Sequence, residues 1–184
     1  VAPDAAPRAA ARSAPRAFGL ALPVARVALF ILGLVPLLRW VWLGATNELG
    51  ANPVEFLTRS SGTWALVCLL VTLGVSPLRT LLKQPALLQL RRMCGLFAFF
   101  YACLHLLSYV WWDQWFDVVA IINDVVRRPF IAAGMTAFVL LVPLAVTSTR
   151  GWMRRLGRRW QALHKLVYVE VGAGLLHYWG QKAG

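Results

Sequence analysis

Long apolar runs, separated by shorter polar segments, dominate the sequence. Each run is close to the ~20 residues that an α-helix needs to cross a bilayer, and none alternates as a barrel strand would. The pattern therefore predicts five membrane-spanning helices, at Leu20–Leu43, Thr63–Leu82, Met93–Trp112, Phe130–Thr147 and Leu163–Trp179. The expected fold class is an all-α integral membrane protein, a single helix bundle without an internal repeat.

The polar segments complete this organisation. Residues 113–129, DQWFDVVAIINDVVRRP, mix acidic with apolar positions and predict a short interfacial helix on the outer face. Residues 152–160, WMRRLGRRW, are basic and should lie at the inner membrane surface. The first 19 residues are rich in Ala, Pro and Arg and predict a disordered cytoplasmic tail, which leaves residues 20–180 as the transmembrane domain.

Composition and charge support a membrane protein. The chain is 59% hydrophobic and only 14% charged, whereas soluble domains carry about 25% charged residues. A net charge of +12 would suggest nucleic acid in a soluble protein. Here the basic residues concentrate in the N-terminal tail and in the second and fourth connections, which predicts a cytoplasmic N-terminus. The basic residues should therefore contact membrane lipid, and no nucleic acid is expected as a partner.

All three histidines lie in or beside apolar runs. His105 follows Arg92 by thirteen residues and His177 follows His164 by thirteen, on two helices that enter from the basic side. At about 1.5 Å per residue, His105 and His177 reach a similar depth in the outer half, while His164 stays near the inner boundary. Two facing neutral imidazoles in an apolar slot are suited to axial ligation of a haem iron. The alternative is that each histidine only forms a hydrogen bond between helices.

Small residues near His177 would help to form such a slot. Gly172 and Gly174 both lie within five residues of it. A second site is harder to build, because thirteen steps of ~100° leave His164 and His177 roughly 140° apart on an ideal helix. The position on the third helix that would face His164 is Arg92. That arginine could bind a haem propionate, a flavin phosphate or a quinone carbonyl, or could simply anchor the helix at the inner face.

Glu170 is the only carboxylate within an apolar run. It predicts a proton relay or a contact to quinone, or else a protonated packing residue. A cofactor-free channel using Glu170 and the histidines is an alternative function, although few polar residues are available to line a pore. No nucleophile–base pair is apparent, so no catalytic residue is assigned and the redox chemistry would belong to a cofactor.

Several segments together resemble the MsrQ (YedZ) family, over about residues 20–180. They are LGANPVEFLTRSSGTWAL, LRRMCGLFAFFYACLHLLSY, RRPFIAAGMTAF, TSTRGWMRRLGRRWQALHKLVY and LLHYW. The resemblance implies a ferric-reductase-like, haem-binding subunit of a periplasmic methionine sulfoxide reductase system in the bacterial inner membrane. Family members usually have six transmembrane helices. Their histidines correspond to His105, His164 and His177 here.

The resemblance also implies a path for electrons. They would come from the quinone pool, with FMN as a further cofactor, and pass through haem b to a periplasmic molybdenum-containing MsrP-type partner. His105 and His177 would be the axial ligands of this haem, and His164 would bind a second haem if there are two. The alternative function is a stand-alone ferric or quinone reductase of the cytochrome b type.

Overall fold

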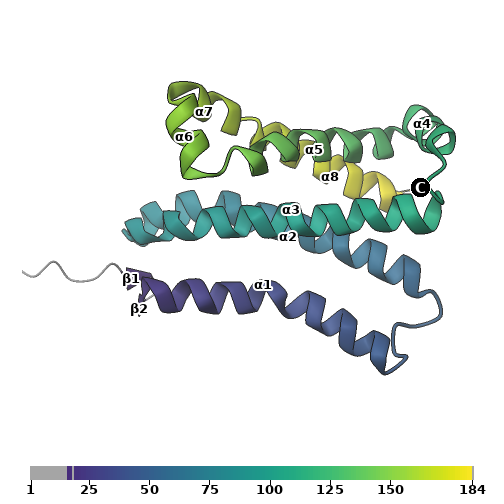
Figure 1. Ribbon diagram of the computed structural model, residues 1–184, viewed down its shortest axis with the longest axis horizontal. Coiled ribbons are helices and arrows are strands. Elements are labelled where there is room, and N and C mark those ends of the chain that lie inside the picture. Colours follow the sequence, from purple (N-terminus) through teal and green to yellow (C-terminus); the bar gives the residue numbers. More distant parts are fainter. Residues whose placement is uncertain (1–15, 18, 184) are drawn as a thin grey trace, which may run out of the picture.

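The computed structural model describes residues 16, 17 and 19–183, and almost all of them are helical. Five long helices lie side by side (Figure 1): α1 (Leu22–Ala45), α2 (Pro53–Leu81), α3 (Leu88–Ser108), α5 (Pro129–Val146) and α8 (Val167–Ala183). Shorter helices lie at the ends of the bundle: α4 (Val118–Arg127), α6 (Arg150–Leu156) and α7 (Arg158–His164). The predicted all-α fold class is confirmed.

Small elements join these helices. A 3-10 turn, η1 (Pro85–Leu87), precedes α3, and a π-helical turn, η2 (Tyr109–Asp113), continues it. Before α1, β1 (Arg16–Ala17) pairs antiparallel with β2 (Leu20–Ala21). Most of the predicted tail, residues 1–19, lies outside the described residues.

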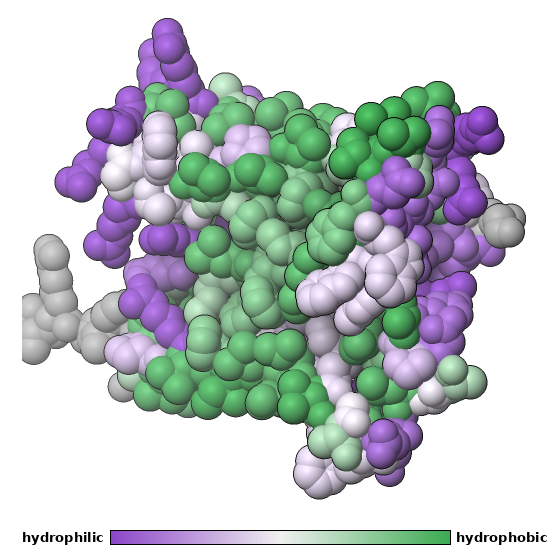
Figure 2. All heavy atoms as spheres, turned by 45° about the vertical axis from the view of Figure 1, so that its right-hand side comes forward, coloured by the Kyte–Doolittle hydropathy of each residue, from purple (hydrophilic) through white to green (hydrophobic). Residues whose placement is uncertain are grey.

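The bundle has the dimensions and surface of a multi-pass membrane protein. Four helices are long and apolar enough to cross a membrane: α1, α2, α5 and the continuous stretch from η1 through α3 to η2. The fifth long helix, α8, has 17 residues, about 25 Å at the helical rise, and packs along α5. Figure 2 shows an apolar belt between two polar ends.

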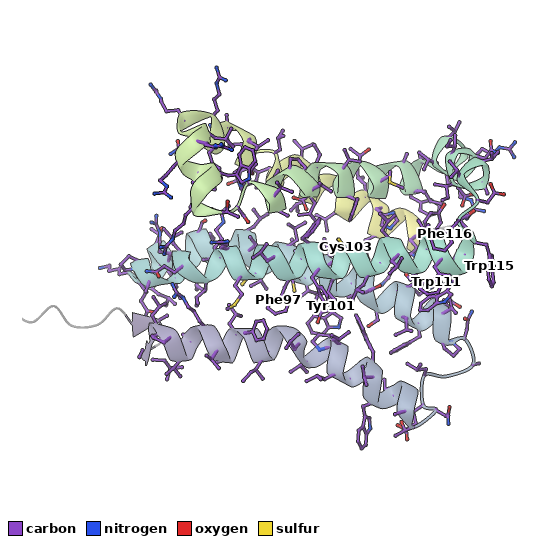
Figure 3. All side chains as sticks on the ribbon, in the orientation of Figure 1. Phe97, Tyr101, Cys103, Trp111, Trp115 and Phe116 are labelled. Carbon is purple, nitrogen blue, oxygen red and sulfur yellow. The ribbon has the colours of Figure 1, made fainter. Side chains whose placement is uncertain are left out.

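The two ends of the bundle differ in character. The α2–α3 connection, α6 and α7 lie at one end, here called the basic end, while α4 and the C-terminus lie at the other, the α4 end (Figure 1). Trp111, Trp115 and Phe116 gather at the α4 end (Figure 3). Aromatic side chains of this kind favour the membrane–water boundary, so this end has the composition of an interface.

Helix α2 begins ten residues before the predicted apolar run. Its first turns are polar, so they raise no hydropathy signal, but they are well capped. The side chain of Asn52 accepts a hydrogen bond from the backbone N–H of Glu55, and Pro53 occupies the first turn, where its missing N–H costs nothing. This extension brings Thr58 and Gly62 into the bundle.

The predicted fifth helix, roughly Leu163–Trp179, begins later than expected, because a turn separates its first residues from the rest. Helix α7 ends at His164 and α8 begins at Val167. Between them the N–H of Leu166 donates to the carbonyl of Leu163, and the N–H of Tyr168 donates to that of Lys165. These three-residue steps tighten the chain into a turn. His164 and His177 therefore lie on different helices, and their angular relation on a single helix does not apply.

Helices α2 and α3 pack together as one pair, and α5 and α8 as another. Helix α1 packs on the first pair through Phe97 and Tyr101 of α3, which project towards it (Figure 3). The Tyr101 hydroxyl donates to the carbonyl of Gly33, and Trp40 Nε1 donates to Ser60 Oγ at 3.0 Å. The interior that remains between the two helix pairs forms the candidate site.

Candidate functional site

A cavity of about 370 Å³ lies between the α2/α3 pair and the α5/α8 pair, in the half of the bundle near the α4 end. Its volume falls within the range of ligand pockets, about 300–1,000 Å³. Small residues from all four helices line much of it: Gly62, Ala65, Ala98, Ala102, Gly134, Ala137 and Gly174. Because these side chains are short, the helices leave room for a ligand between them.

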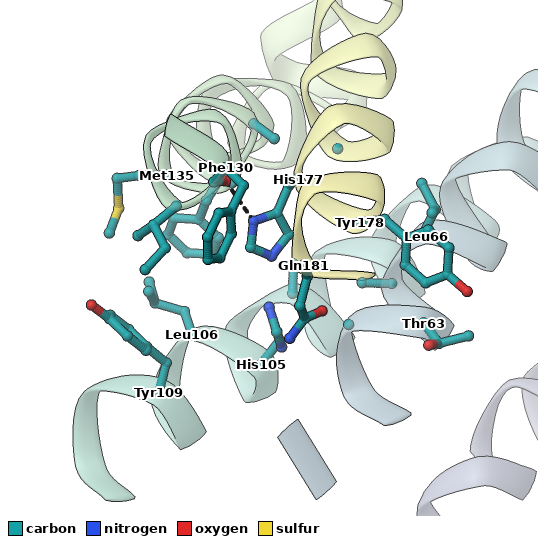
Figure 4. Close-up of a pocket in the computed structure, with 18 of the residues that line it drawn as sticks. Thr63, Leu66, His105, Leu106, Tyr109, Phe130, Met135, His177, Tyr178 and Gln181 are labelled. Atoms are coloured by element: carbon teal, nitrogen blue, oxygen red, sulfur yellow. Dashed lines mark hydrogen bonds between the residues drawn. The ribbon is translucent and has the colours of Figure 1, made fainter. Parts of the chain in front are cut away.

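Two of the predicted ligands meet in this cavity. His105 enters from α3 and His177 from α8, and their rings point toward each other (Figure 4). The ring centroids are 5.7 Å apart and the ring planes are inclined by 67°. The matched depth predicted from the sequence agrees with this arrangement.

Each imidazole is held by a backbone carbonyl of the neighbouring helix. His105 Nδ1 lies 2.8 Å from the carbonyl oxygen of Thr58. His177 Nδ1 lies 2.7 Å from the carbonyl oxygen of Phe130 (Figure 4). A carbonyl only accepts, so in both rings Nδ1 carries the proton and donates it. The neutral ring then has a free lone pair on Nε2, the tautomer that metal-binding histidines adopt.

On each helix that supplies a carbonyl, a glycine four residues later leaves room for the imidazole ring to approach that helix. A Cβ atom at Gly62 would stand 3.0 Å from His105 Nδ1, and one at Gly134 would stand 2.6 Å from His177 Nδ1. The second distance is shorter than real Cβ contacts. Gly134 is therefore required for the position of His177, and Gly62 favours that of His105.

The two halves of the cavity repeat one another with a constant offset of 72 residues. The lining positions include twelve pairs at this offset: 58/130, 59/131, 62/134, 63/135, 65/137, 66/138, 69/141, 98/170, 102/174, 105/177, 106/178 and 109/181. The sequence reading found no internal repeat. The structure reveals a local one, in which α2/α3 and α5/α8 contribute equivalent walls.

The geometry fits a haem iron between the two rings. An iron bound by both Nε2 atoms at about 2 Å, with about 1 Å from each nitrogen to its ring centre, would separate the centroids by about 6 Å. The observed separation is 5.7 Å. In the described part of the chain, two buried side-chain polar atoms have no hydrogen-bond partner, Thr58 Oγ1 and Glu170 Oε2, and both residues line this cavity.

The other predicted ligands, His164 and Arg92, do not line this cavity. His164 Nε2 lies 3.1 Å from Thr147 Oγ1, and the ring stacks on Trp160 with centroids 4.0 Å apart. Burial, and secondarily the charge of Arg91, lower the pKa of His164. Arg92 is exposed on α3. The structure thus brings His105 and His177 together and leaves Arg92 and His164 at the basic end.

Sequence reasoning missed the second wall of the site. It named Gly172 and Gly174, of which Gly174 lines the cavity, but it did not name Gly62, Gly134 or the two carbonyls. One signal was available, because each of these glycines precedes a cavity histidine by 43 residues. The carbonyls carry no such signal, since every residue has one.

The apolar helices and the two facing histidines between them are those of a multi-pass membrane protein with an internal binding site. Comparison with known proteins also gives a transmembrane family. A family model described as "Ferric reductase like transmembrane component" matches residues 61–175. The chain belongs to the MsrQ family. No solved structure matches the chain.

The relatives carry the name "Protein-methionine-sulfoxide reductase heme-binding subunit MsrQ". The protein of Bordetella pertussis is 59% identical over 169 residues, which cover 92% of this chain and 80% of that protein. The protein of Herminiimonas arsenicoxydans is 55% identical over 157 residues, 85% of this chain and 72% of that protein. The protein of Ralstonia nicotianae is 54% identical over 164 residues, 89% of this chain and 76% of that protein.

Proposed function

We propose that residues 20–180 form a transmembrane electron-transfer subunit that holds haem b between His105 and His177. The observation that carries this proposal is the pair of facing rings, each with Nδ1 bonded to a carbonyl and Nε2 free. The haem-binding name of the relatives supports it. The bound haem would supply a one-electron redox centre.

The residues around the rings would orient and charge-balance this group. The carbonyls of Thr58 and Phe130 fix the tautomer of the two histidines. Arg59 and Arg128 line the cavity towards the α4 end, each within 4 Å of an acidic side chain one turn away. They are the cations closest at hand for the acidic groups of a haem.

The charges at the two ends support the orientation that we propose for this path. The basic end would face the cytoplasm of a bacterium, with the N-terminus on that side of the inner membrane. The cavity would then lie in the periplasmic half, close to a periplasmic acceptor. We propose a molybdenum-containing MsrP-type reductase subunit as this acceptor, because the relatives are named as subunits of a methionine sulfoxide reductase.

The donor side of the proposal rests on the family resemblance. Quinone would deliver the electrons, and FMN would be a further cofactor bound at the basic end, where Arg91 and Arg92 offer cations for a phosphate. His164 would be the ligand of a second haem if two are present. Arg92 lies at the equivalent position of the repeat, 72 residues earlier, and would approach the acidic groups of that haem.

A second candidate function is a stand-alone ferric or quinone reductase of the cytochrome b type. The match to a ferric-reductase-like family model favours it. If this is correct, the purified protein should reduce ferric chelates rapidly with quinol alone. If the electron-transfer proposal is correct, rapid quinol oxidation should require the MsrP-type subunit.

Haem content tests the site directly. On reduction with dithionite, the purified wild-type protein should show the Soret and α absorption bands of haem b. His105→Ala or His177→Ala should remove the haem of the cavity, because one axial ligand is lost. The ratio of haem to protein measures the effect. His164→Ala should keep the haem of the cavity, since His164 does not line the cavity; it tests the second site separately.

The outcomes separate the possibilities. Unchanged haem content in both cavity variants would refute the assignment of these ligands. Loss of part of the haem in His164→Ala, with the rest retained, would identify a second haem. A wild-type protein that remains colourless when expressed in haem-supplied cells would refute the proposed function as a whole.

A further inference from the structure

Glu170 is a buried acid in the wall of the cavity. It lies on α8, seven residues before His177, about 10 Å along the helix towards the basic end. The residue is 1% exposed, and its Oε2 atom has no hydrogen-bond partner. The equivalent residue of the other half is Ala98, so this carboxyl breaks the symmetry of the cavity.

The surroundings offer no fixed positive charge to this carboxyl. It lies beside a buried apolar cluster that includes Leu69, Ala98 and Leu144. Neither ion pair found within residues 16–17 and 19–183 involves Glu170. A carboxylate at this depth without a cation would be costly, so the group is a neutral carboxylic acid unless a positive charge enters the cavity.

The titratable groups near Glu170 can be identified helix by helix. Helix α5 contains none, and α2 contributes the thiol of Cys68, which packs against the same apolar cluster and interacts with Cys94 of α3. On the side of the basic end, His164 lies six residues before Glu170 at the end of α7, with Arg91 of α3 near it. The titratable groups of the cavity wall other than Glu170 lie towards the α4 end: Arg59, His105, Tyr109, Asp113, Arg128, His177 and Tyr178. Because Glu170 and both histidines line one cavity, the charge of Glu170 responds to what is bound between the two histidines.

We infer that Glu170 binds a proton when the cofactor of this cavity is reduced and releases it when the cofactor is oxidised. This inference rests on the proposed function. A bis-imidazole haem centre carries one more positive charge in the ferric than in the ferrous state. At a separation on the order of 10 Å and an effective dielectric constant near 20, this charge changes the proton affinity of a carboxylate roughly tenfold.

The step balances in charge and atoms. A bound haem would accept one electron, which quinol would supply in the proposed function, and the carboxylate of Glu170 would bind a proton from solvent to form an O–H bond. When the electron passes on to the acceptor, that bond breaks and the proton returns to solvent. Because a tenfold change in affinity corresponds to only part of one proton per electron, Glu170 would offset part of the change in net charge of the apolar cavity between the two redox states.

Redox titration of the haem-containing protein tests this inference. Midpoint potentials are measured in buffers from acidic to alkaline pH for the wild type and for Glu170→Gln, which keeps the shape but cannot ionise. The wild-type potential should fall with rising pH by about 59 mV in total, the one-electron equivalent of a tenfold change in affinity. Glu170→Gln should lack this fall and keep the higher potential of acidic wild type.

Two further variants provide controls. Glu48→Gln removes a carboxylate from the exposed α1–α2 connection and should behave as wild type, whereas Glu170→Asp should retain the pH dependence. Independently of any variant, the reduced-minus-oxidised infrared spectrum of the wild type should contain a carboxylic acid C=O band, which Glu170→Gln should lack.

The failures are distinguishable. If the wild type binds no haem, the proposed function is refuted and this inference with it. If haem is bound but the wild type and Glu170→Gln show the same pH dependence, Glu170 is not the coupled group and the proposed function stands. Absence of the C=O band from the wild-type difference spectrum would overturn the inference even if Glu170→Gln could not be purified.

Discussion

Gly134 and His177 form the tighter of the two glycine–histidine contacts. A methyl group at residue 134 would stand 2.6 Å from His177 Nδ1, against 3.0 Å for the corresponding pair of Gly62 and His105. The same Nδ1 atom donates to the carbonyl of Phe130. Displacing the ring would therefore disturb both its hydrogen bond and the position of Nε2.

Gly134→Ala should greatly reduce haem content, because the added methyl group moves His177 out of line. Overpacking of this kind costs about 1–3 kcal/mol. Gly62→Ala should have a smaller effect in the same direction. Gly172→Ala is the control, since a Cβ atom there meets nothing within 4 Å. Equal haem content in Gly134→Ala and Gly172→Ala would contradict this account of the site.

The sequence alone predicts the two histidines of the site, but it does not predict the residues that hold them in place. The depth of His105 and His177 follows from helical rise and charge alone, so their meeting was predictable. Their glycine and carbonyl partners depend on which helices pack together, which hydropathy does not specify. The repeat was hidden because only four of its twelve lining pairs are identical: Gly62/Gly134, Ala65/Ala137, Leu69/Leu141 and His105/His177.

At the scale of elements, α4 is fixed to the end of α3 through one acid. Asp124 of α4 accepts hydrogen bonds from the Tyr109 hydroxyl at 3.1 Å and from Gln114 Nε2 at 2.9 Å. Its other oxygen is 3.4 Å from Arg128 Nε. Because Tyr109 and Arg128 also line the cavity, the position of this interfacial helix is coupled to the rim of the site.

Tyr109→Phe should lower the thermal midpoint of the protein by a few degrees, because it removes one hydrogen bond worth about 1 kcal/mol. Tyr168→Phe is the matched control, since Tyr168 is 68% exposed on α8. Thermal unfolding in the same detergent compares the two. A midpoint for Tyr109→Phe no lower than that of Tyr168→Phe would show that this contact does not hold α4.

Element positions were predictable where apolar runs coincide with helices, as in α1 and α5. They were not predictable where a polar turn continues a helix, as before residue 63 in α2, or where an apolar run is interrupted without Pro or Gly, as at Lys165 and Leu166. In both cases the local hydrogen bonds set the boundary, and hydropathy does not report them.

At the scale of the whole molecule, the unequal charge of the two ends defines an orientation. The basic end contains α6 and α7 with Arg154, Arg155, Arg158 and Arg159. The α4 end contains exposed apolar residues of α4, among them Val126, which is 78% exposed. By the positive-inside rule we expect the first end to face the cytoplasm.

Labelling with a membrane-impermeant maleimide should reveal this orientation in intact cells whose outer membrane has been made permeable. In a cysteine-free background, Val126→Cys should be labelled from outside, and Arg155→Cys only after the inner membrane is lysed. The opposite pattern would invert the proposed topology and place the cavity next to the cytoplasm.

The position of the cavity between two separate helix pairs also affects how stable the protein is in the cell before its ligand binds. A group bound by α3 on one side and α8 on the other would link the two helix pairs, and a ligand that binds only the assembled state stabilises that state by mass action. Newly inserted apoprotein would thus be the loosest form of the chain and the most open to membrane proteases. Cellular haem supply would then set how much of the protein survives, before any electron is transferred.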